Sequence, residues 1–418
     1  MGNLAIHGGS PVRSETFPRH PVIGAKEKQA VAEVMDSGEL SSFVAISGEN
    51  FLGGKRVLDF EQRFADYHGT KFAISFNSAT SALHAAVVAV GVDPGEEVIV
   101  TPYSFSASAA CALMHGAIPV FGDVQEDIYC LDPQSVESLV SPLTKVVIPV
   151  HLFGHPADMD ELMKVARKHD LKVIEDCAQS PGAFYKGQRT GTIGDCGVFS
   201  FTENKNITTG EGGMLITNDP RIAEVAQLVR NHGEVIDPGD QLQRLGSIYL
   251  GWNYRLTEFQ AALGIVQFDK LDALNVIRTE LAGHLNEKLR GARGLTISTV
   301  YPDCTHVYYI YALKYDADEI GVSRDLFIKA LAAEGIPFGG GYVPPLYESP
   351  YYQKKLAAPF RYYKGNAQYS KGTCPTCEQL YERDLIITQI ARSPATKKDM
   401  DDVVLAFEKI FDNISDLQ

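Results

Sequence analysis

An apolar run near the middle of the chain ends in two carboxylates. Residues 172–177 read Lys-Val-Ile-Glu-Asp-Cys, a pattern that predicts a buried strand stopping at Glu175 and Asp176. In parallel α/β sheets, ligands bind at the carboxyl ends of the strands, so Asp176 would face a ligand crevice. Taken alone, this acid is better explained as a strand-end carboxylate that caps the next turn.

A lysine follows at a distance that suits a neighbouring strand. Lys205 stands 29 residues after Asp176, behind a β-rich run at 197–201 and a polar turn. The glycine-rich run 208–213 comes next, and glycine lets a backbone approach another group closely. An isolated lysine is normally a solvated surface charge, but this context predicts a lysine amine close to the acid.

An acid and a lysine in this arrangement are what pyridoxal 5′-phosphate (PLP) chemistry needs. The lysine amine forms a Schiff base with the cofactor and moves protons, while the carboxylate keeps the pyridine nitrogen protonated. The ring then becomes an electron sink for the carbanion at the substrate carbon. We therefore predict Lys205 and Asp176 as the catalytic residues of a PLP enzyme.

The phosphate of this cofactor needs an anion site, and residues 75–81 offer one. Ser-Phe-Asn-Ser-Ala-Thr-Ser joins a predicted strand to a helix, where small residues let backbone N–H groups converge. An ordinary Ser/Thr helix cap has the same pattern, and the two interpretations are compatible. Ser200 could add a hydroxyl to the phosphate, and Phe105 could stack on the ring or belong to the core.

Strand and helix patterns alternate around these residues, from about residue 70 to 220. Helical segments separate short apolar runs at 72–76, 97–100, 118–121, 145–150 and 172–174. This order predicts an α/β fold with a mostly parallel sheet and helices on both faces.

A helical stretch over 256–285 leaves this region. We expect a large PLP-binding domain over 1–275 and a smaller α+β domain over 276–418. Residues 1–25 are candidates to pack on the smaller domain. Residues 351–377 are polar and rich in tyrosine, so a surface excursion is expected there.

Composition excludes several classes of protein. The formal net charge of −14 argues against a general nucleic-acid binder. No apolar run approaches the roughly 20 residues of a membrane span, and the first residues do not resemble a signal peptide. Seven scattered cysteines fit reduced thiols in a cytoplasmic protein. The single CxxC at 374–377 lacks the further ligands of a zinc site, so no metal is expected.

Several motifs, in order, resemble the DegT/DnrJ/EryC1/StrS family of sugar aminotransferases, of aspartate-aminotransferase fold type I. Their order and spacing fit over about residues 20–280, and the remainder matches more loosely. The matching runs are Ser78–His84, Pro149–Gly154, Val173–Gln179, Phe199–Gly213, Arg230–Gly233 and Gly251–Arg255.

The resemblance implies a role for each residue around the cofactor ring. Lys205 would hold the Schiff base, and Asp176 would bind the pyridine nitrogen. Gln179 would approach the ring hydroxyl, and Phe105 would stack on the ring. Many family members carry His where this chain has Thr202, which puts the substrate contacts near the lysine in question.

The resemblance also implies the phosphate contacts. Ala79, Thr80 and Ser200 would bind the phosphate within one chain. Many members have Gly-Thr in place of Ala79-Thr80, a change without consequence because backbone amides make the contact. Asn253 would reach the phosphate of the neighbouring subunit, so the active unit would be a homodimer with shared sites.

Transamination is the implied reaction, because family members with His in place of the lysine are dehydratases and Lys205 is present here. The enzyme would move an amino group from L-glutamate or L-glutamine to a keto-sugar, nucleotide keto-sugar or cyclitol ketone, in amino-sugar biosynthesis. A PLP-dependent sugar dehydratase or an amino-hydroxybenzoate-type synthase of the same family is the alternative. A regulator or scaffold without catalysis would be expected to have lost Lys205 or Asp176.

Two features bear on the substrate. Residues 17–21, Phe-Pro-Arg-His-Pro, resemble members that aminate cyclitol ketones such as scyllo-inosose, although nucleotide-sugar members and members acting on keto-sugar acids also fit. Residues 276–418 hold no arginine in a recognisable carboxylate clamp, and 339–345 resembles an open loop, which favours a polyhydroxy ketone as acceptor. Candidates for an anionic group, each otherwise a surface or structural residue, are Arg19, His20, Arg230, His232 and Arg255.

Overall fold

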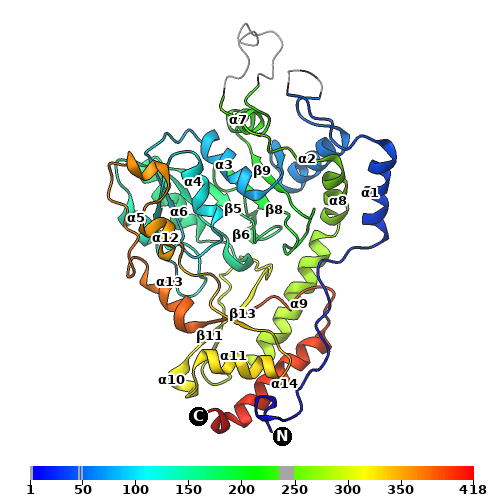
Figure 1. The fold of residues 1–418 in the computed structure, drawn as a ribbon, viewed down its shortest axis with the longest axis vertical. Coiled ribbons are helices and arrows are strands. Elements are labelled where there is room, and N and C mark those ends of the chain that lie inside the picture. The colour runs from blue at the N-terminus through cyan, green and yellow to red at the C-terminus, as the bar shows by residue number, and fades with distance from the viewer. Residues whose placement is uncertain (1–2, 46–47, 49, 235–248) are drawn as a thin grey trace.

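The computed structural model describes residues 3–45, 48, 50–234 and 249–418. A seven-stranded sheet with the order β1-β9-β8-β5-β4-β2-β3 forms its larger part (Figure 1). Only β9 runs antiparallel to its neighbours, so the predicted mostly parallel α/β sheet is confirmed. The strands are β1 (Phe72–Phe76), β2 (Glu97–Val100), β3 (Ile118–Phe121), β4 (Thr144–Ile148), β5 (Lys172–Asp176), β8 (Cys196–Ser200) and β9 (Gly213–Thr217).

Both faces of this sheet are buried, because alternate residues of a strand point to opposite sides. Along β9, Leu215 packs in one hydrophobic cluster with α3, while Met214 and Ile216 pack in another with α2 and α8. The helices around the sheet are α1 (Ala25–Ser37), α2 (Lys55–His68), α3 (Ala79–Ala89), α4 (Ala107–Met114), α5 (Pro133–Leu139), α6 (Met159–His169), α7 (Pro220–Arg230) and α8 (Glu258–Phe268).

The helical stretch predicted over 256–285 is two helices. α8 ends at Phe268, and α9 (Leu271–Leu289) starts after a break at residues 269–270. In Figure 1, α9 runs from the region of the large sheet to the lower part of the molecule. It therefore connects the seven-stranded sheet to the four-stranded sheet described next.

A smaller antiparallel sheet, with the order β10-β11-β13-β12, lies at the far end of α9. Leu4, near the start of the chain, joins its hydrophobic cluster, and Glu334 accepts hydrogen bonds from the amides of Ala5 and Val12. The domain boundary at residue 275 stays a prediction. The elements here are β10 (Leu295–Ile297), β11 (Tyr311–Tyr315), α10 (Ala317–Ile320), α11 (Arg324–Ala333), β12 (Gly339–Gly340), β13 (Leu385–Thr388) and α14 (Lys397–Asp412).

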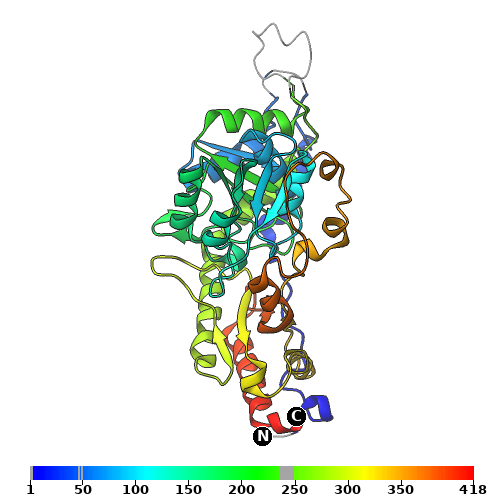
Figure 2. The ribbon, with the colours of Figure 1, turned by 90° about the vertical axis from the view of Figure 1, so that its left-hand side faces the viewer.

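Residues 351–377, with α12 (Pro350–Gln353) and α13 (Pro375–Gln379), lie along the flank of the large sheet (Figure 2). The Tyr369 hydroxyl donates to Pro119 O of the edge strand β3 (2.8 Å), and Asp123 accepts from the amides at 376 and 377. Tyrosine suits such a place, because its ring is buried while its hydroxyl is bonded. The segment is an excursion, as predicted, but its tyrosines cover a sheet edge.

No helix in the residues described is both long and apolar enough to cross a membrane.

Candidate active site

A cavity of about 450 Å³ lies where β5 and β8 end. It includes seven of the eight residues predicted to bind the cofactor: Ala79, Thr80, Phe105, Asp176, Gln179, Ser200 and Lys205. β5 and β8 are parallel neighbours, and Asp176 pairs with Val198 two residues before Ser200. Adjacent strands therefore bring together residues that are far apart in the sequence, as the strand-end argument predicted.

Asp176 is a buried carboxylate, only 3% exposed. Its Oδ2 accepts a hydrogen bond from Ser108 Oγ (2.7 Å), and its Oδ1 accepts one from Ala178 N (3.1 Å). Ser108 in turn lies 3.0 Å from the hydroxyl of Ser104. No ion pair to Asp176 is found in the part of the chain that the structure describes. A buried carboxylate without a cation is costly, so this site fits a cationic ligand.

Glu175 points away from the cavity, to the other face of β5. Its carboxylate accepts hydrogen bonds from the amides of Gly191, Ile193 and Gly194 at 2.7–2.8 Å. His151 Nε2 also donates to it at 2.9 Å, because His151 Nδ1 accepts from a backbone amide. Glu175 thus stabilises the loop that leads into β8, and only the second of the two adjacent acids is available to a ligand.

Lys205 lies at the end of a tight turn after β8 and is 8% exposed. The turn is closed by hydrogen bonds from Lys205 N to Thr202 O (3.0 Å) and from Thr209 N to Phe201 O (2.9 Å). Its Nζ is 4.3 Å from the ring centroid of Tyr309, and no ion pair to it occurs among the described residues. The carbonyl of Lys205 accepts from His20 Nε2 at 2.9 Å, so the N-terminal segment reaches this turn.

The N-terminus of α3 forms another wall of the cavity. Ser78 caps the helix by accepting from Ser81 N (3.1 Å), which leaves the amides of Ala79 and Thr80 without partners inside the helix. A Cβ on Gly213 would lie 2.6 Å from Ala79 N, so β9 passes this helix end as closely as only glycine permits. Free amides at a helix N-terminus favour an anion such as phosphate.

Gln179, which follows β5 of the large sheet, connects it to Tyr342 in the segment after β12. Its side-chain oxygen accepts from Phe153 N (2.8 Å), and its amide donates to the hydroxyl of Tyr342 (3.2 Å). Tyr342 and Tyr309 both line the cavity, and sequence reasoning named neither as a site residue, although Tyr342 lies in the 339–345 loop that was expected over the site. Ser104 and Ser108 were also missed, although their spacing of four residues at the start of a helix is a usable signal.

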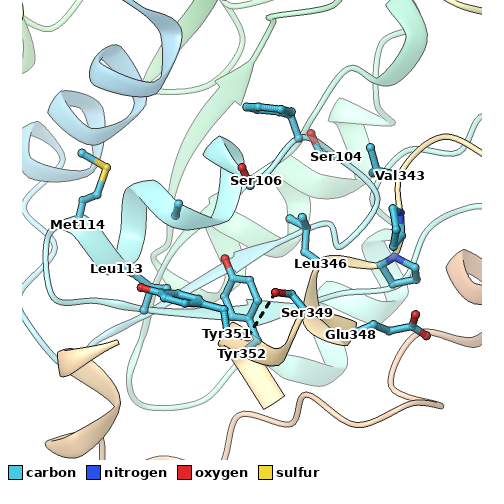
Figure 3. A pocket seen from close by; sticks show the side chains of 14 residues that line it. Ser104, Ser106, Leu113, Met114, Val343, Leu346, Glu348, Ser349, Tyr351 and Tyr352 are labelled. Atoms are coloured by element: carbon cyan, nitrogen blue, oxygen red, sulfur yellow. Dashed lines mark hydrogen bonds between the residues drawn. The ribbon is translucent and has the colours of Figure 1, made fainter. Parts of the chain in front are cut away.

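Phe105 is 62% exposed and lines two cavities. The second cavity, about 760 Å³, shares Ser104, Phe105 and Val343 with the first. Figure 3 shows Leu113 and Met114 of α4 on one side and Tyr351 and Tyr352 of α12 on another. The excursion described above therefore supplies part of the surroundings of the site.

Asn253 does not line the cavity and is exposed. Among the candidates for an anionic group, Arg230 is structural, because its buried guanidinium pairs with Glu61 at 2.6 Å. Arg255 donates to Asn231 (2.8 Å), whereas Arg19 and His232 are exposed.

Comparisons with known proteins show what this chain is similar to. The model of the DegT/DnrJ/EryC1/StrS aminotransferase family matches residues 21–407. GDP-perosamine synthase of Caulobacter vibrioides is 40% identical over 317 residues, 76% of this chain and 81% of that protein. L-glutamine:2-deoxy-scyllo-inosose aminotransferase of Micromonospora echinospora is 35% identical, with 100% of both chains covered.

A solved structure of an aminotransferase is also similar to this chain. The X-ray structure of the aminotransferase from Psychrobacter cryohalolentis has a TM-score of 0.84 and 31% identity, covering 96% of this chain and 100% of that one. The chain belongs to the DegT/DnrJ/EryC1/StrS aminotransferase family.

Proposed function

We propose that this protein is a PLP-dependent aminotransferase that moves an amino group from L-glutamate or L-glutamine to a keto-sugar or cyclitol ketone. The observation that carries the proposal is the meeting of Lys205 and Asp176 in one cavity. Both are buried, and neither has an ion-pair partner among residues 3–45, 48, 50–234 and 249–418.

The residues around the cavity fit PLP at each of its parts. Asp176 would face the pyridine nitrogen, and Lys205 would hold the aldehyde carbon. The amides of Ala79 and Thr80, with the hydroxyl of Ser200, would bind the phosphate. Phe105 would stack on the ring and Gln179 would approach the ring hydroxyl. When bound, PLP supplies a conjugated ring that accepts the electrons left behind by a departing proton.

The protein's own groups would then manage protons. Nζ of Lys205 would take the proton from the Cα of the amino donor and later deliver a proton to the carbonyl carbon of the acceptor, acting as general base and acid. Asp176 would hold a proton on the ring nitrogen. The hydrogen bond that Ser108 donates fixes the Asp176 carboxylate for this role. The buried turn around Lys205 would keep water away from the amine.

The residues that line the two cavities support a polyhydroxy ketone as the acceptor. Ser104, Tyr309 and Tyr342, which carry hydroxyl groups, are among the residues that line the first cavity. The second cavity adds room beside aromatic and aliphatic side chains. A sugar or cyclitol ring needs hydrogen bonds at its edge and an apolar surface at its face, and these two cavities offer both.

We also propose a homodimer in which Asn253 completes the phosphate site of the partner. Asn253 is exposed and lies outside the cavity of its own chain, as this arrangement requires.

A panel of ketones tests the function. The protein loaded with pyridoxamine phosphate is offered keto-sugars, cyclitol ketones and 2-keto acids, and products are identified by mass spectrometry. An aminated sugar or cyclitol, formed with one equivalent of pyridoxamine phosphate converted to PLP, supports the proposal. L-glutamate or L-glutamine added afterwards should regenerate the pyridoxamine form, one equivalent being consumed. A product that has lost water without gaining nitrogen would instead identify a sugar dehydratase.

A further inference from the structure

Tyr309 covers the amine of Lys205 with the face of its ring. Nζ of Lys205 lies 4.3 Å from the ring centroid, and both residues line the first cavity. Tyr309 is 3% exposed and Lys205 is 8% exposed, so the contact is shielded from water. The face of an aromatic ring attracts a positive charge, and the attraction is stronger where water is excluded.

The segment that carries Tyr309 is fixed to the large sheet on both sides of this residue. Val307 N donates to Gly154 O at 3.0 Å, and Ile310 N donates to Phe153 O at 3.3 Å. These two acceptors belong to the turn that follows β4. The backbone around Tyr309 is therefore held two residues before it and one residue after it.

Tyr308, the preceding residue, has a backbone conformation that is rare for a large side chain. Its φ is +45°, in the left-handed region, where the Cβ of a non-glycine residue is crowded. Tyr308 N donates to His306 Nδ1 (2.9 Å), and the two rings stack at 3.9 Å. The buried Arg278 donates from Nη1 to Tyr308 O at 3.2 Å. Strain that is held in this way is typical of active sites, and here it lies next to the ring that faces Lys205.

The amine of Lys205 changes its charge during the proposed reaction. It is neutral when it takes a proton from the substrate carbon, and it is positive until it delivers that proton. No ion pair to Lys205 occurs among the described residues, so the charged amine depends on other contacts. The ring face of Tyr309 is such a contact, because it favours the charged state.

We propose that Tyr309 is a positioning residue whose ring holds the protonated amine of Lys205 between proton uptake and proton delivery. This inference rests on the proposed function. The C–H bond of the substrate breaks and an N–H bond forms at Nζ, while the electron pair stays with the substrate and the bound cofactor. Delivery reverses these changes at the carbon that receives the proton, so no further reactant is needed. The ring alone is required, which separates phenylalanine from aliphatic replacements.

The test compares Tyr309→Phe with Tyr309→Leu in the full-length protein loaded with PLP. Phenylalanine keeps the ring face and removes a hydroxyl that makes no hydrogen bond among the described residues. Leucine stays apolar and removes the ring. We expect kcat of Tyr309→Leu to be about tenfold below that of Tyr309→Phe, because only the second variant can hold the charged amine. The KM for the amino donor should stay within twofold in both.

Tyr362→Leu is the matched control. It makes the same replacement at a tyrosine that is 79% exposed and lines neither cavity. Its kinetics should equal those of the unmodified protein.

Half-reactions and an isotope effect identify the step that the ring assists. Rapid mixing with the amino donor follows the conversion of PLP to pyridoxamine phosphate by absorbance, and the donor's keto acid follows the reverse. Tyr309→Leu should slow both half-reactions by similar factors, because Lys205 moves a proton in each. With the donor deuterated at Cα, the isotope effect on the first half-reaction should be larger in Tyr309→Leu than in Tyr309→Phe.

The NMR signal of Lys205 gives a reading that does not depend on turnover. It is recorded in the pyridoxamine phosphate form, where the amine is free, with lysine labelled by ¹³C at Cε. Lys205→Arg identifies the signal. Because nuclei over a ring face are shifted upfield, the shift should be present in the unmodified protein and in Tyr309→Phe and lost in Tyr309→Leu.

Three results would overturn the inference. Equal kcat for the phenylalanine and leucine variants would leave the ring without a role. A raised donor KM with an unaltered isotope effect would assign Tyr309 to substrate binding. A Lys205 signal without an upfield shift in the unmodified protein would remove the contact itself. Absence of transamination in the unmodified protein would refute the proposed function instead, and the NMR signal would still decide whether the ring holds the amine.

Discussion

The hydroxyl of Ser108 donates a 2.7 Å hydrogen bond to the carboxylate of Asp176. Both side chains are buried, so this bond fixes the acid in a place that water does not reach. Hydrogen bonds to charged groups contribute about 1.5–3 kcal/mol, more than neutral ones. This bond connects α4 to Asp176 at the end of β5.

Ser108→Ala should lower kcat about tenfold, because the carboxylate loses an anchor worth at least about 1.4 kcal/mol in the transition state. Steady-state kinetics measures the effect. Ser138→Ala is the control, since Ser138 is exposed in α5 and lines neither cavity. Equal kinetics for both variants would contradict a role for the Ser108 bond.

Asp176→Asn should bind PLP and turn over more than about tenfold more slowly, a loss above about 1.4 kcal/mol. Without the carboxylate the ring nitrogen loses its proton more readily. Cofactor content by absorbance and kcat by coupled assay are measured on the same sample. A smaller loss in fully loaded protein would mean that the acid is not needed electrostatically.

Lys205→Ala should keep PLP without a covalent bond and should lose turnover. The Lys205 amine is the nucleophile proposed to join the cofactor, and alanine has none. Borohydride treatment followed by mass spectrometry of the intact protein detects a covalent adduct. An adduct retained in this variant would assign the attachment to a different lysine.

Mixing two inactive variants tests the shared site. Lys205→Ala lacks the amine, and Asn253→Asp places a negative charge near the partner's phosphate. In the proposed dimer, a mixed pair regains one intact site, so activity should return after subunit exchange. Exchange is verified with differently tagged chains, and each variant incubated alone is the control. Verified exchange without recovered activity would rule against Asn253 crossing between subunits.

Stability should depend on pH through His68. Burial lowers the pKa of His68 to about 3, and its ring stacks on Phe64 at 4.5 Å. The unfolded chain takes up this proton near pH 6.5, whereas the folded protein does not. The stabilisation is therefore complete above pH 6.5 and is lost as the pH falls toward 3, by about 1.4 kcal/mol per pH unit.

Between pH 6.5 and 5, His68→Phe should reduce the slope of the unfolding free energy against pH by about 1.4 kcal/mol per pH unit. Urea unfolding at several pH values measures it. His7→Phe changes an exposed histidine and should leave the slope as in the unmodified protein. A slope unaltered by His68→Phe would show that other groups carry the acid sensitivity.

The parts of the site that could be predicted are those encoded by short sequence patterns. Asp176 follows a buried strand, Ala79 and Thr80 start a helix behind small residues, and Lys205 precedes a glycine-rich run. Strand alternation also separates Glu175 from Asp176 once the strand is recognised. Each of these inferences needs only neighbouring residues, so the structure brings the predicted set together.

The parts that escaped prediction depend on segments that meet only in three dimensions. Tyr309 and Tyr342 reach the cavity from segments more than 100 residues beyond Lys205. The break between α8 and α9 was missed because both helices have apolar residues at helical spacing across it.

The excursion at residues 351–377 makes the recognition surface modular. Its residues Tyr351 and Tyr352 contribute to the second cavity, whereas Lys205 and Asp176 stand on other segments and line only the first. Its attachment to the rim of β3 through Tyr369 is independent of the catalytic strands. Replacing this segment with one of different length therefore alters which molecules the second cavity admits, while Lys205 and Asp176 keep their positions.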